Sequence, residues 1–426
     1  ASNIVASEQG VALIEAFAFG LATMSWYGDR QADDTTLQFA RLRFAAVTIA
    51  RQLGYKARAA VPPVVDVRVQ LTTIPPVQLI IKKGQKAAGP NGLIFETIAD
   101  LVFDAGQVGS GSPAGMTVNS LAVNPSTPSI IYAGTSTGIL KTVNTGLLWT
   151  AQNSGLSTLN VTTLTMDPTN PRVLYAGTNV GGIFKSVDGA TSWSSINSGL
   201  TNLKILAIAV DPVTPTILYA GTDAGGVFRS ANGGASWTAM NGGLGDLVVP
   251  ALAVDQVTPA TVYAATFGLG IYKTTNSGVS WASSSIGLGT LNVLEIALDP
   301  TTPSTIYLCT NGGGIYKTTT SGALWIPSNT GLTSLIPTCI AIDPTATSTI
   351  YVGTNETGVF KTTTAGAAWI SASVGLTTTA ISSIAIDPIS PANVFAGTNG
   401  GGVFTTINSA LTWSPVNTGI DDPIKI

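Results

Sequence analysis

Carboxylates recur at a fixed spacing in this sequence, and a spaced set of acids is the first place to look for chemistry. An aspartate ends an apolar run in six places 44 residues apart, with Asn124 in the place before them: Asp167, Asp211, Asp255, Asp299, Asp343 and Asp387. A glycosidase needs two singular carboxylates in different environments. A repeated Asp, usually followed by Pro, is typical of a turn after a strand. We therefore interpret this column as architectural.

The remaining chemical groups give little support for catalysis. The sequence has no histidine and two cysteines, Cys309 and Cys339, which stand in strand-like apolar runs. The absence of histidine excludes a histidine general base and mixed Cys/His zinc sites, and apolar surroundings are typical of buried thiols. In the repeat region, acids outside the column are few: Asp188, Asp223, Asp246, Glu295, Glu356, Asp421 and Asp422. We predict no catalytic residue, no cofactor and no metal site, and we expect that the chain is not an enzyme.

A second column is basic. Six of seven repeats carry a cation at one position, and Thr405 breaks the pattern in the last: Lys141, Lys185, Arg229, Lys273, Lys317 and Lys361. A ring of cations would suit phosphorylated glycans. The favoured interpretation is that these are solvated strand ends near the aspartate column.

Tryptophans set the period that positions all these residues. Every interval between them is 44 residues: Trp149, Trp193, Trp237, Trp281, Trp325, Trp369 and Trp413. In the second repeat, four β-rich runs separated by turn residues cover Val161 to Met166, Arg172 to Thr178, Gly182 to Lys185 and Thr191 to Ile196. A four-stranded repeat of this length buries its faces when several copies stand radially about an axis. Seven copies predict a mainly β fold, a seven-bladed β-propeller of four-stranded blades.

The turn before each tryptophan carries a known pattern. In the second repeat it reads Ser186-Val187-Asp188-Gly189-Ala190-Thr191-Ser192-Trp193. This resembles the Asp-box (BNR) repeat of sialidases, sortilin-like receptors, some glucanases and photosystem assembly factors of the Ycf48 kind. The acidic position keeps Asp only at Asp188 and is otherwise Asn or Thr, so we interpret it as a structural turn cap. The three arginines that the sialidase resemblance would require are not present, because the propeller has only Arg172 and Arg229.

Composition excludes further function classes. Charged residues make up 10 % of the chain and the net charge is -3, against about 25 % charged in typical domains. Nucleic-acid-binding proteins usually show a basic patch, so no nucleic acid is expected as a partner. The apolar stretch from Gly10 to Gly28 contains Glu15 and fits neither a signal peptide nor a membrane span. No membrane insertion is expected.

The region before the repeats follows different rules. Residues 8–55 show apolar spacing typical of two or three helices, and short β-rich runs follow up to Phe103. A Gly/Ser-rich stretch covers 106–115. We therefore expect a small α+β N-terminal domain over 1–105, a linker over 106–115 and the propeller over 116–426.

The N-terminal region also carries a resemblance. Residues 8–107, with Trp26-Tyr27-Gly28-Asp29-Arg30 and Ile80-Ile81-Lys82-Lys83-Gly84 among their motifs, resemble the start of baseplate J-like wedge proteins of contractile phage tails. The family's later domains are absent, and the propeller stands in their place. The resemblance implies an anchoring role in an assembly, with other baseplate or tail proteins as partners of 1–105.

The two resemblances together favour one function over two alternatives. We expect a structural component of a phage tail baseplate or related contractile injection system, located in the virion or injection particle and assembled in the host cytoplasm. Its propeller would contact proteins or adhere to a host-surface glycan or receptor. The alternatives are a free-standing assembly factor of the Ycf48 kind and, less favoured, a carbohydrate-active hydrolase. Candidate ligand residues lie in loops on the face opposite the Trp-preceding turns: Asn179, Asp223, Phe267, Asn355 and Glu356.

Overall fold

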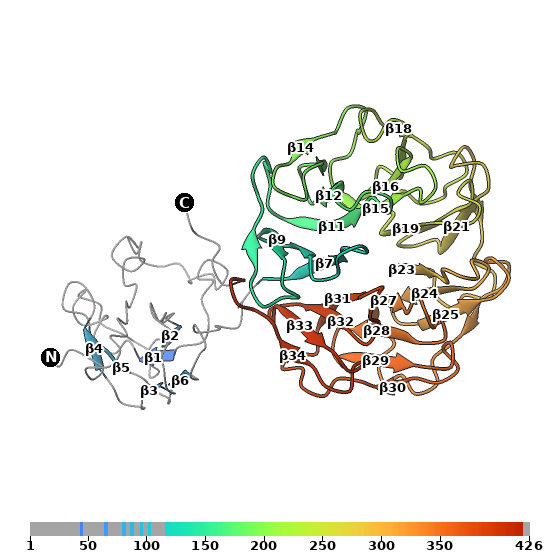
Figure 1. Ribbon diagram of the computed structural model, residues 1–426. Helices are drawn as coiled ribbons and strands as arrows, with labels where there is room; N and C mark the ends of the chain where they lie inside the picture. Colours follow the sequence, from blue (N-terminus) through green and yellow to red (C-terminus); the bar gives the residue numbers. More distant parts are fainter. Residues whose placement is uncertain are drawn as a thin grey trace, which may run out of the picture. The chain divides into compact units, whose positions relative to one another are not determined.

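The computed structural model describes residues 116–420 in full and, before them, the backbone of six short strands (Figure 1). The chain divides into two compact units, Ala1–Gly115 and Met116–Ile426, which are treated separately below. Among the described residues, no helix has the length and hydrophobicity that crossing a membrane requires.

The first unit contains three antiparallel strand pairs. They are β1 (Arg43–Ala45) with β2 (Val64–Asp66), β3 (Leu79–Ile81) with β6 (Leu101–Phe103), and β4 (Lys86–Ala88) with β5 (Ile94–Glu96). The helices expected over 8–55 lie outside the described residues, except that β1 is a strand within that range. The α+β character and the anchoring role of this unit remain predictions.

Residues 116–420 confirm the predicted fold. They form seven four-stranded sheets, each built from four consecutive strands, arranged radially about a central axis (Figure 1). The blades are, in order, β7 (Val118–Val123), β8 (Ile131–Thr135), β9 (Gly138–Thr142), β10 (Thr150–Ala151); β11 (Val161–Met166), β12 (Leu174–Thr178), β13 (Ile183–Ser186), β14 (Ser194–Ser195); β15 (Ile205–Val210), β16 (Leu218–Thr222), β17 (Val227–Ser230), β18 (Thr238–Ala239); β19 (Ala251–Val254), β20 (Val262–Ala265), β21 (Ile271–Thr274), β22 (Ala282–Ser283). The last three are β23 (Val293–Leu298), β24 (Ile306–Thr310), β25 (Gly314–Thr318), β26 (Ile326–Pro327); β27 (Pro337–Ile342), β28 (Ile350–Thr354), β29 (Val359–Thr362), β30 (Ile370–Ser371); β31 (Ile381–Ile386), β32 (Val394–Thr398), β33 (Val403–Thr406), β34 (Ser414–Pro415).

Each blade runs from the axis to the rim. The first strand lies innermost and the two-residue fourth strand lies at the rim, exposed (Figure 1). The second strand is buried along its whole length, as in β12, because neighbouring blades cover both of its faces. The apolar core therefore lies between blades, and Tyr132 and Ile139 of blade 1 pack with Leu174 and Trp193 of blade 2.

Each repeated tryptophan joins its own blade to the preceding one. All seven are 1 to 5 % exposed. Trp193 Nε1 donates to the carbonyl of Gln152 at 2.9 Å, and the other six make the equivalent bond. Trp149 closes the ring by donating to Val416 of blade 7 at 2.8 Å. Burial of a large ring with its N–H paired is what keeps adjacent sheets in register.

The aspartate column caps the turns between first and second strands. Asp299 Oδ1 accepts from the backbone N–H groups of Thr301 and Thr302 at 2.9 and 3.0 Å, and its counterparts, Asn124 included, cap the same two positions. A carboxylate and an amide oxygen are equivalent acceptors here, so the column has a turn-capping role.

The basic column holds neighbouring blades together. Lys317 Nζ lies 5.3 Å from the centroid of the Tyr307 ring and donates to the carbonyl of Ala365 in the next blade at 2.8 Å. The same arrangement occurs at Lys141, Lys185, Lys273 and Lys361. These side chains are not the freely solvated ends that the sequence suggested. We call each such set of cation, ring and carbonyl a clamp.

Candidate functional site

The turn that ends at each tryptophan, called the Trp turn from here on, is held by its own side chains. Asp188 accepts from Ser186 Oγ and from the N–H and hydroxyl of Ser192 at 2.6 to 3.0 Å. Hydrogen bonds from Ser192, and then from Ser186, lower the pKa of Asp188 to about 2. Asn232 makes the same contacts with Ser230 and Ser236 without a charge.

The opposite face, called the hairpin face, carries a ring of paired positions around the central channel. In six blades the first residue after the second strand donates its backbone N–H to the carbonyl of the residue just ahead of the first strand, and in blade 4 Phe267 and Val248 make the equivalent bond. The pairs are Ser136 and Thr117, Asn179 and Asn160, Asp223 and Lys204, Phe267 and Val248, Asn311 and Asn292, Asn355 and Ile336, and Asn399 and Ala380. The backbone repeats while the side chains differ, which is the usual arrangement of a binding surface on a rigid scaffold.

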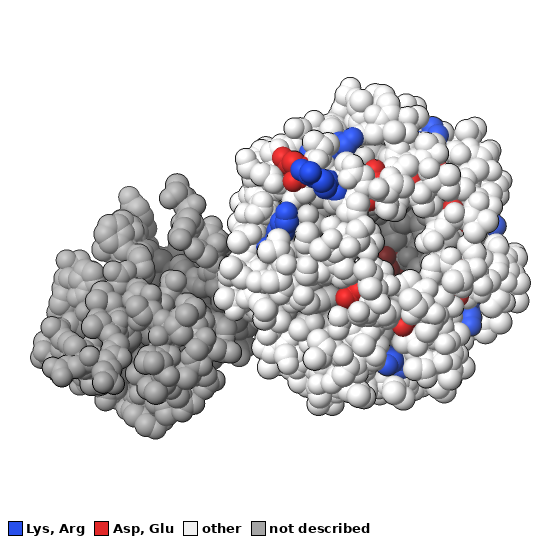
Figure 2. Space-filling model, in the orientation of Figure 1, with Lys and Arg blue, Asp and Glu red and all other residues white. Residues whose placement is uncertain are grey.

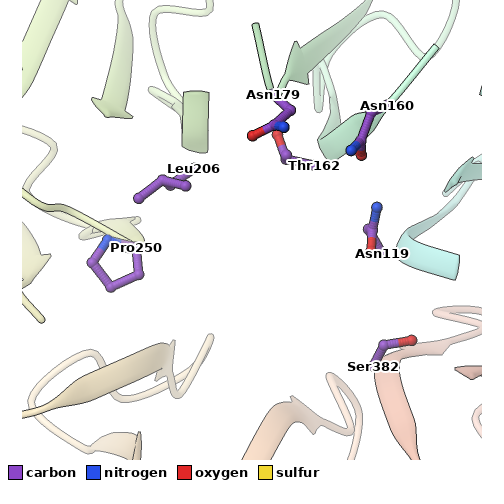
Figure 3. A pocket seen from close by; sticks show the side chains of 7 residues that line it. All are labelled: Asn119, Asn160, Thr162, Asn179, Leu206, Pro250 and Ser382. Carbon is purple, nitrogen blue, oxygen red and sulfur yellow. The ribbon is translucent and has the colours of Figure 1, made fainter. Parts of the chain in front are cut away.

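A cavity of about 380 Å³ opens at this end of the channel (Figure 3). It is lined by Asn119, Asn160, Thr162, Asn179, Leu206, Pro250 and Ser382. Five of these lining residues occupy one repeat position, at or just before the start of the innermost strand: Asn119, Thr162, Leu206, Pro250 and Ser382. In most blades a β-bulge at this position turns the extra side chain out of the ladder. We call this cavity the channel mouth.

The channel mouth has a polar side and an apolar side. In blades 7, 1 and 2 the bulged side chain donates to the next blade, as Thr162 Oγ1 does to the carbonyl of Ile205 at 2.6 Å. Asn119 and Ser382 make equivalent bonds to Val161 and Val118. Blades 3 and 4 instead present Leu206 and Pro250, which have no side-chain donor.

Two amides on the polar side are unengaged. No described residue hydrogen-bonds to the side-chain amide of Asn160 or Asn179, and both line the cavity (Figure 3). Each amide offers two donors and an acceptor. The mouth therefore presents neutral hydrogen-bonding groups opposite an apolar wall, a combination typical of sites for small uncharged ligands.

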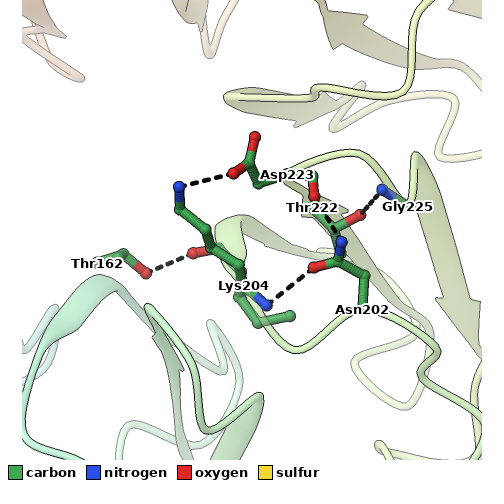
Figure 4. Close-up of polar contacts among 7 residues, drawn as sticks. Thr162, Asn202, Lys204, Thr222, Asp223 and Gly225 are labelled. Carbon is green, nitrogen blue, oxygen red and sulfur yellow. Dashed lines mark hydrogen bonds and ion pairs between the residues drawn. The ribbon is translucent and has the colours of Figure 1, made fainter.

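An ion pair lies at the edge of the mouth. Lys204 and Asp223 of blade 3 occupy the positions that Asn160 and Asn179 hold in blade 2. Lys204 Nζ lies 2.6 Å from Asp223 Oδ2, with both side chains partly exposed (Figure 4). Asn202 accepts from the Lys204 N–H and donates to the Asp223 carbonyl. A surface pair of this kind stabilises by about 0 to 1 kcal/mol. Charges are otherwise sparse over the face seen in Figure 2, where acidic atoms border the central hollow.

The proposed ligand residues lie in the hairpins of four different blades. Asn179, Asp223, Phe267 and Asn355 occupy the same ring position in four blades, and Asn179 lines the mouth. Phe267 is 51 % exposed. Glu356 follows Asn355 in the hairpin and is exposed.

Sequence reasoning missed the inner half of the site. The expected ligand residues came only from hairpins between second and third strands, where the side chains differ between blades. Asn160 and Lys204 precede the first strand, and the bulged residues Asn119 and Thr162 lie at its start. Aligning the repeats at those positions would have exposed the same variability. The bulge itself has no sequence signal that separates it from a regular strand.

One carboxyl on the inner strands stands apart from the turns. Glu295 lies on β23, opposite Cys309 of β24, and is partly buried. Burial raises the pKa of Glu295 to about 7, and a hydrogen bond from the Ile296 N–H opposes this. Burial likewise raises the pKa of Cys339 to about 12, so neither buried thiol is a ready nucleophile. The described residues hold no cluster of metal ligands.

Comparisons with known proteins show the fold of the second unit. No protein-family model matches the sequence, and no curated protein matches it. Among solved structures, a GH74 xyloglucanase from Xanthomonas campestris is 17 % identical with a TM-score of 0.62, over 72 % of this chain and 55 % of that one. YCF48 from Cyanidioschyzon merolae is 15 % identical with a TM-score of 0.51, over 69 % and 96 %. YCF48 bound to D1 peptide is 14 % identical with a TM-score of 0.51, over 79 % and 100 %.

These similarities define a mainly β propeller like those of GH74 enzymes and YCF48, and they correct one expectation. The prediction that the chain is not an enzyme was wrong as an exclusion, because the propellers that resemble it include GH74 glycoside hydrolases. That expectation rested on the absence of histidine and on the small number of carboxylates outside the aspartate column. A fold shared by a hydrolase and a peptide-binding protein does not by itself select between them. The chain spans about half the length of the xyloglucanase.

Proposed function

We propose that this chain is a binding component of a larger particle, in which residues 1–105 anchor it and the channel mouth binds an uncharged, hydroxyl-rich partner, a glycan. The observation that carries the proposal is the two-sided mouth, with the unengaged amides of Asn160 and Asn179 facing Leu206 and Pro250 across the cavity. Sugar rings present hydroxyl groups along their edges and C–H groups on their faces, so both sides of the mouth find partners.

Electrostatics support a neutral ligand. Lys204 is neutralised by Asp223 at 2.6 Å, and the clamp lysines near the rim donate to backbone carbonyls. A phosphorylated or strongly acidic ligand would find no unpaired cation among the residues that line the mouth. Phe267, half exposed in the hairpin of blade 4, offers a ring on which a sugar can stack.

The resemblance of residues 8–107 to baseplate J-like wedge proteins supports a particular kind of particle, a contractile tail baseplate or injection system. A protein contact in place of a glycan is supported by the propeller of YCF48, solved with a peptide. The anchoring role is tested by deleting residues 1–105: the remaining propeller should no longer enter the particle, and its incorporation would contradict the anchor.

Binding is tested by calorimetry of the full chain with neutral xyloglucan oligosaccharides, a probe chosen from the GH74 similarity. We expect binding that is lost in the double variant Asn160→Ala, Asn179→Ala. Asn276→Ala, in a Trp turn on the opposite face, is the matched control and should bind normally. Equal affinity in all three proteins would contradict a site at the mouth.

A second candidate function is glycoside hydrolysis, supported by the GH74 propellers that this fold resembles, with Glu295 as the candidate general acid. Its pKa of about 7 leaves it partly protonated at neutral pH, the state that a general acid requires. The test is release of reducing ends from xyloglucan by the full chain. Activity that disappears in Glu295→Gln would establish this function, and absence of product would refute it without affecting the binding proposal.

A further inference from the structure

Six of the seven blades place a cation over a tyrosine beside the joint with the next blade. In each, a lysine or arginine of the third strand lies over a tyrosine of the second, at 5.3 to 6.0 Å from the ring centroid. Five of the six cations also donate to a carbonyl in the Trp turn of the next blade. Arg229 is the one that stacks without this bond.

The seventh joint, between blade 7 and blade 1, lacks both partners. Phe395 occupies the tyrosine position and Thr405 the cation position. Thr405 Oγ1 donates within its own blade, to Val394 at 3.4 Å. The two replacements occur together, so the clamp is missing as a unit.

Two oxygens at this joint are left without a cation. The Thr145 carbonyl is the counterpart of the carbonyls that accept from lysine in other blades, and no described residue donates to it. Asp387 is the counterpart of Asp255, Asp299 and Asp343. Burial lowers the pKa of the lysine in the same blade as each of these three, and their carboxylates oppose that shift. Thr145 and Thr405 are both partly exposed, so solvent reaches the position.

The surface around this joint is apolar. Ile407 and Leu411 in the Trp turn of blade 7 are 74 and 71 % exposed, and Val143, Leu147 and Leu148 in that of blade 1 are 61, 69 and 48 % exposed. In blades 2 to 6 the same positions hold Thr, Ala or Ser, apart from Val187, Val279 and Leu324.

The Trp turn of blade 1 packs against blade 7. A Cβ at Gly146, in the turn of blade 1, would meet Val416 of blade 7 at 2.9 Å. Among the Trp turns, exposed aliphatic side chains are therefore most numerous on the two that flank the joint with neither tyrosine nor cation, and exposed apolar groups of this kind mark contact surfaces.

We propose that this joint is a docking site for an apolar segment of a partner protein that carries one lysine or arginine. The aliphatic side chains take the apolar residues of the segment. The cation takes the position that blades 1 to 6 fill for themselves, donating to the Thr145 carbonyl near the Asp387 carboxylate. Complementary charge at the centre of an apolar contact fixes its register and orientation. The site lies on the Trp-turn face, opposite the channel mouth, so it does not depend on glycan binding.

The test uses the full chain and a short synthetic peptide with one lysine flanked by leucines, followed by fluorescence anisotropy. A twin peptide with norleucine in place of lysine should bind at least about tenfold more weakly, the ratio that 1.4 kcal/mol gives. The double variant Phe395→Tyr, Thr405→Lys builds the missing clamp and should lose the preference for the lysine peptide. Leu411→Ala should weaken both peptides.

A matched control opens a clamp elsewhere. Lys317→Met frees the Ala365 carbonyl between blades 5 and 6, where Thr363 and Ala367 replace the aliphatic residues, and it should create no second site. Tryptophan fluorescence checks that each variant is folded. Equal affinity for the two peptides, no measurable binding of the lysine peptide, or an unchanged preference in the double variant would each overturn the proposal.

Discussion

Replacing Glu295 with glutamine should stabilise the propeller at pH 8 and leave its stability unchanged at pH 4. Burial raises the pKa of this carboxyl from 4.5 to about 7. Because the folded-state pKa is the higher one, the stability that the protonated carboxyl contributes is present below pH 4.5 and is lost as the pH rises through 7. A rise in pKa from 4.5 to about 7 corresponds to roughly 3 kcal/mol. Since Glu295 is partly exposed in the channel, solvent screens some of this and we expect about 2 kcal/mol.

Urea unfolding followed by tryptophan fluorescence measures the difference. Glu295→Gln should unfold at the same urea concentration as the wild type at pH 4 and at a higher one at pH 8. Glu356→Gln, which changes an exposed glutamate, is the control and should match the wild type at both values. Two results would refute a Glu295 pKa raised by burial. One is a Glu295→Gln protein that is no more stable than the wild type at pH 8, and the other is a variant equally stabilised at both pH values.

Three further predictions follow from the same contacts. Lys317→Met should lower the free energy of unfolding by about 1 to 2 kcal/mol in thermal melts, because the charged hydrogen bond to Ala365 and the ring contact are lost while burial of the charge is relieved; an unchanged melt would contradict the clamp. Stability should fall as the pH rises from 10 to 12, because burial raises the pKa of Tyr307 to about 12 and the folded state keeps its proton; Tyr307→Phe should reduce that fall, and an identical pH profile would count against it. Asn179→Ala should weaken oligosaccharide binding about tenfold, one lost hydrogen bond to a neutral group, with no change in melting temperature, and a change in melting alone would mean that the amide is structural.

The blades could be predicted from the sequence because their determinants repeat. A tryptophan at fixed spacing, an aromatic-led second strand and an aspartate after the first strand recur in each blade, and each recurrence reports the same local environment. The first strand of the second blade was predicted at its observed bounds, Val161–Met166. The outermost strands were predicted too long, because β14 pairs over only Ser194–Ser195 before the chain turns toward the next blade.

The site could be predicted only in part because it depends on contacts between blades. Asn179 and Phe267 were found because the hairpin side chains differ between blades. Their partners Asn160 and Val248 lie in the connection that leads from the preceding blade into the first strand. The clamp was also hidden, since the sequence places Lys317 near Asp299 and gives no sign that its ammonium group crosses to Ala365, 48 residues later. A repeat period reports what each blade has in common, whereas the geometry between blades decides what each side chain touches.

Glycan binding at the channel mouth is tested most directly by a crystal structure of the full chain grown with a neutral xyloglucan oligosaccharide. We expect sugar density in the cavity, with hydroxyl groups hydrogen-bonded to the amides of Asn160 and Asn179 and a ring face against Leu206 or Pro250. An empty mouth at ligand concentrations that saturate binding in solution, or sugar bound only on the Trp-turn face, would contradict it.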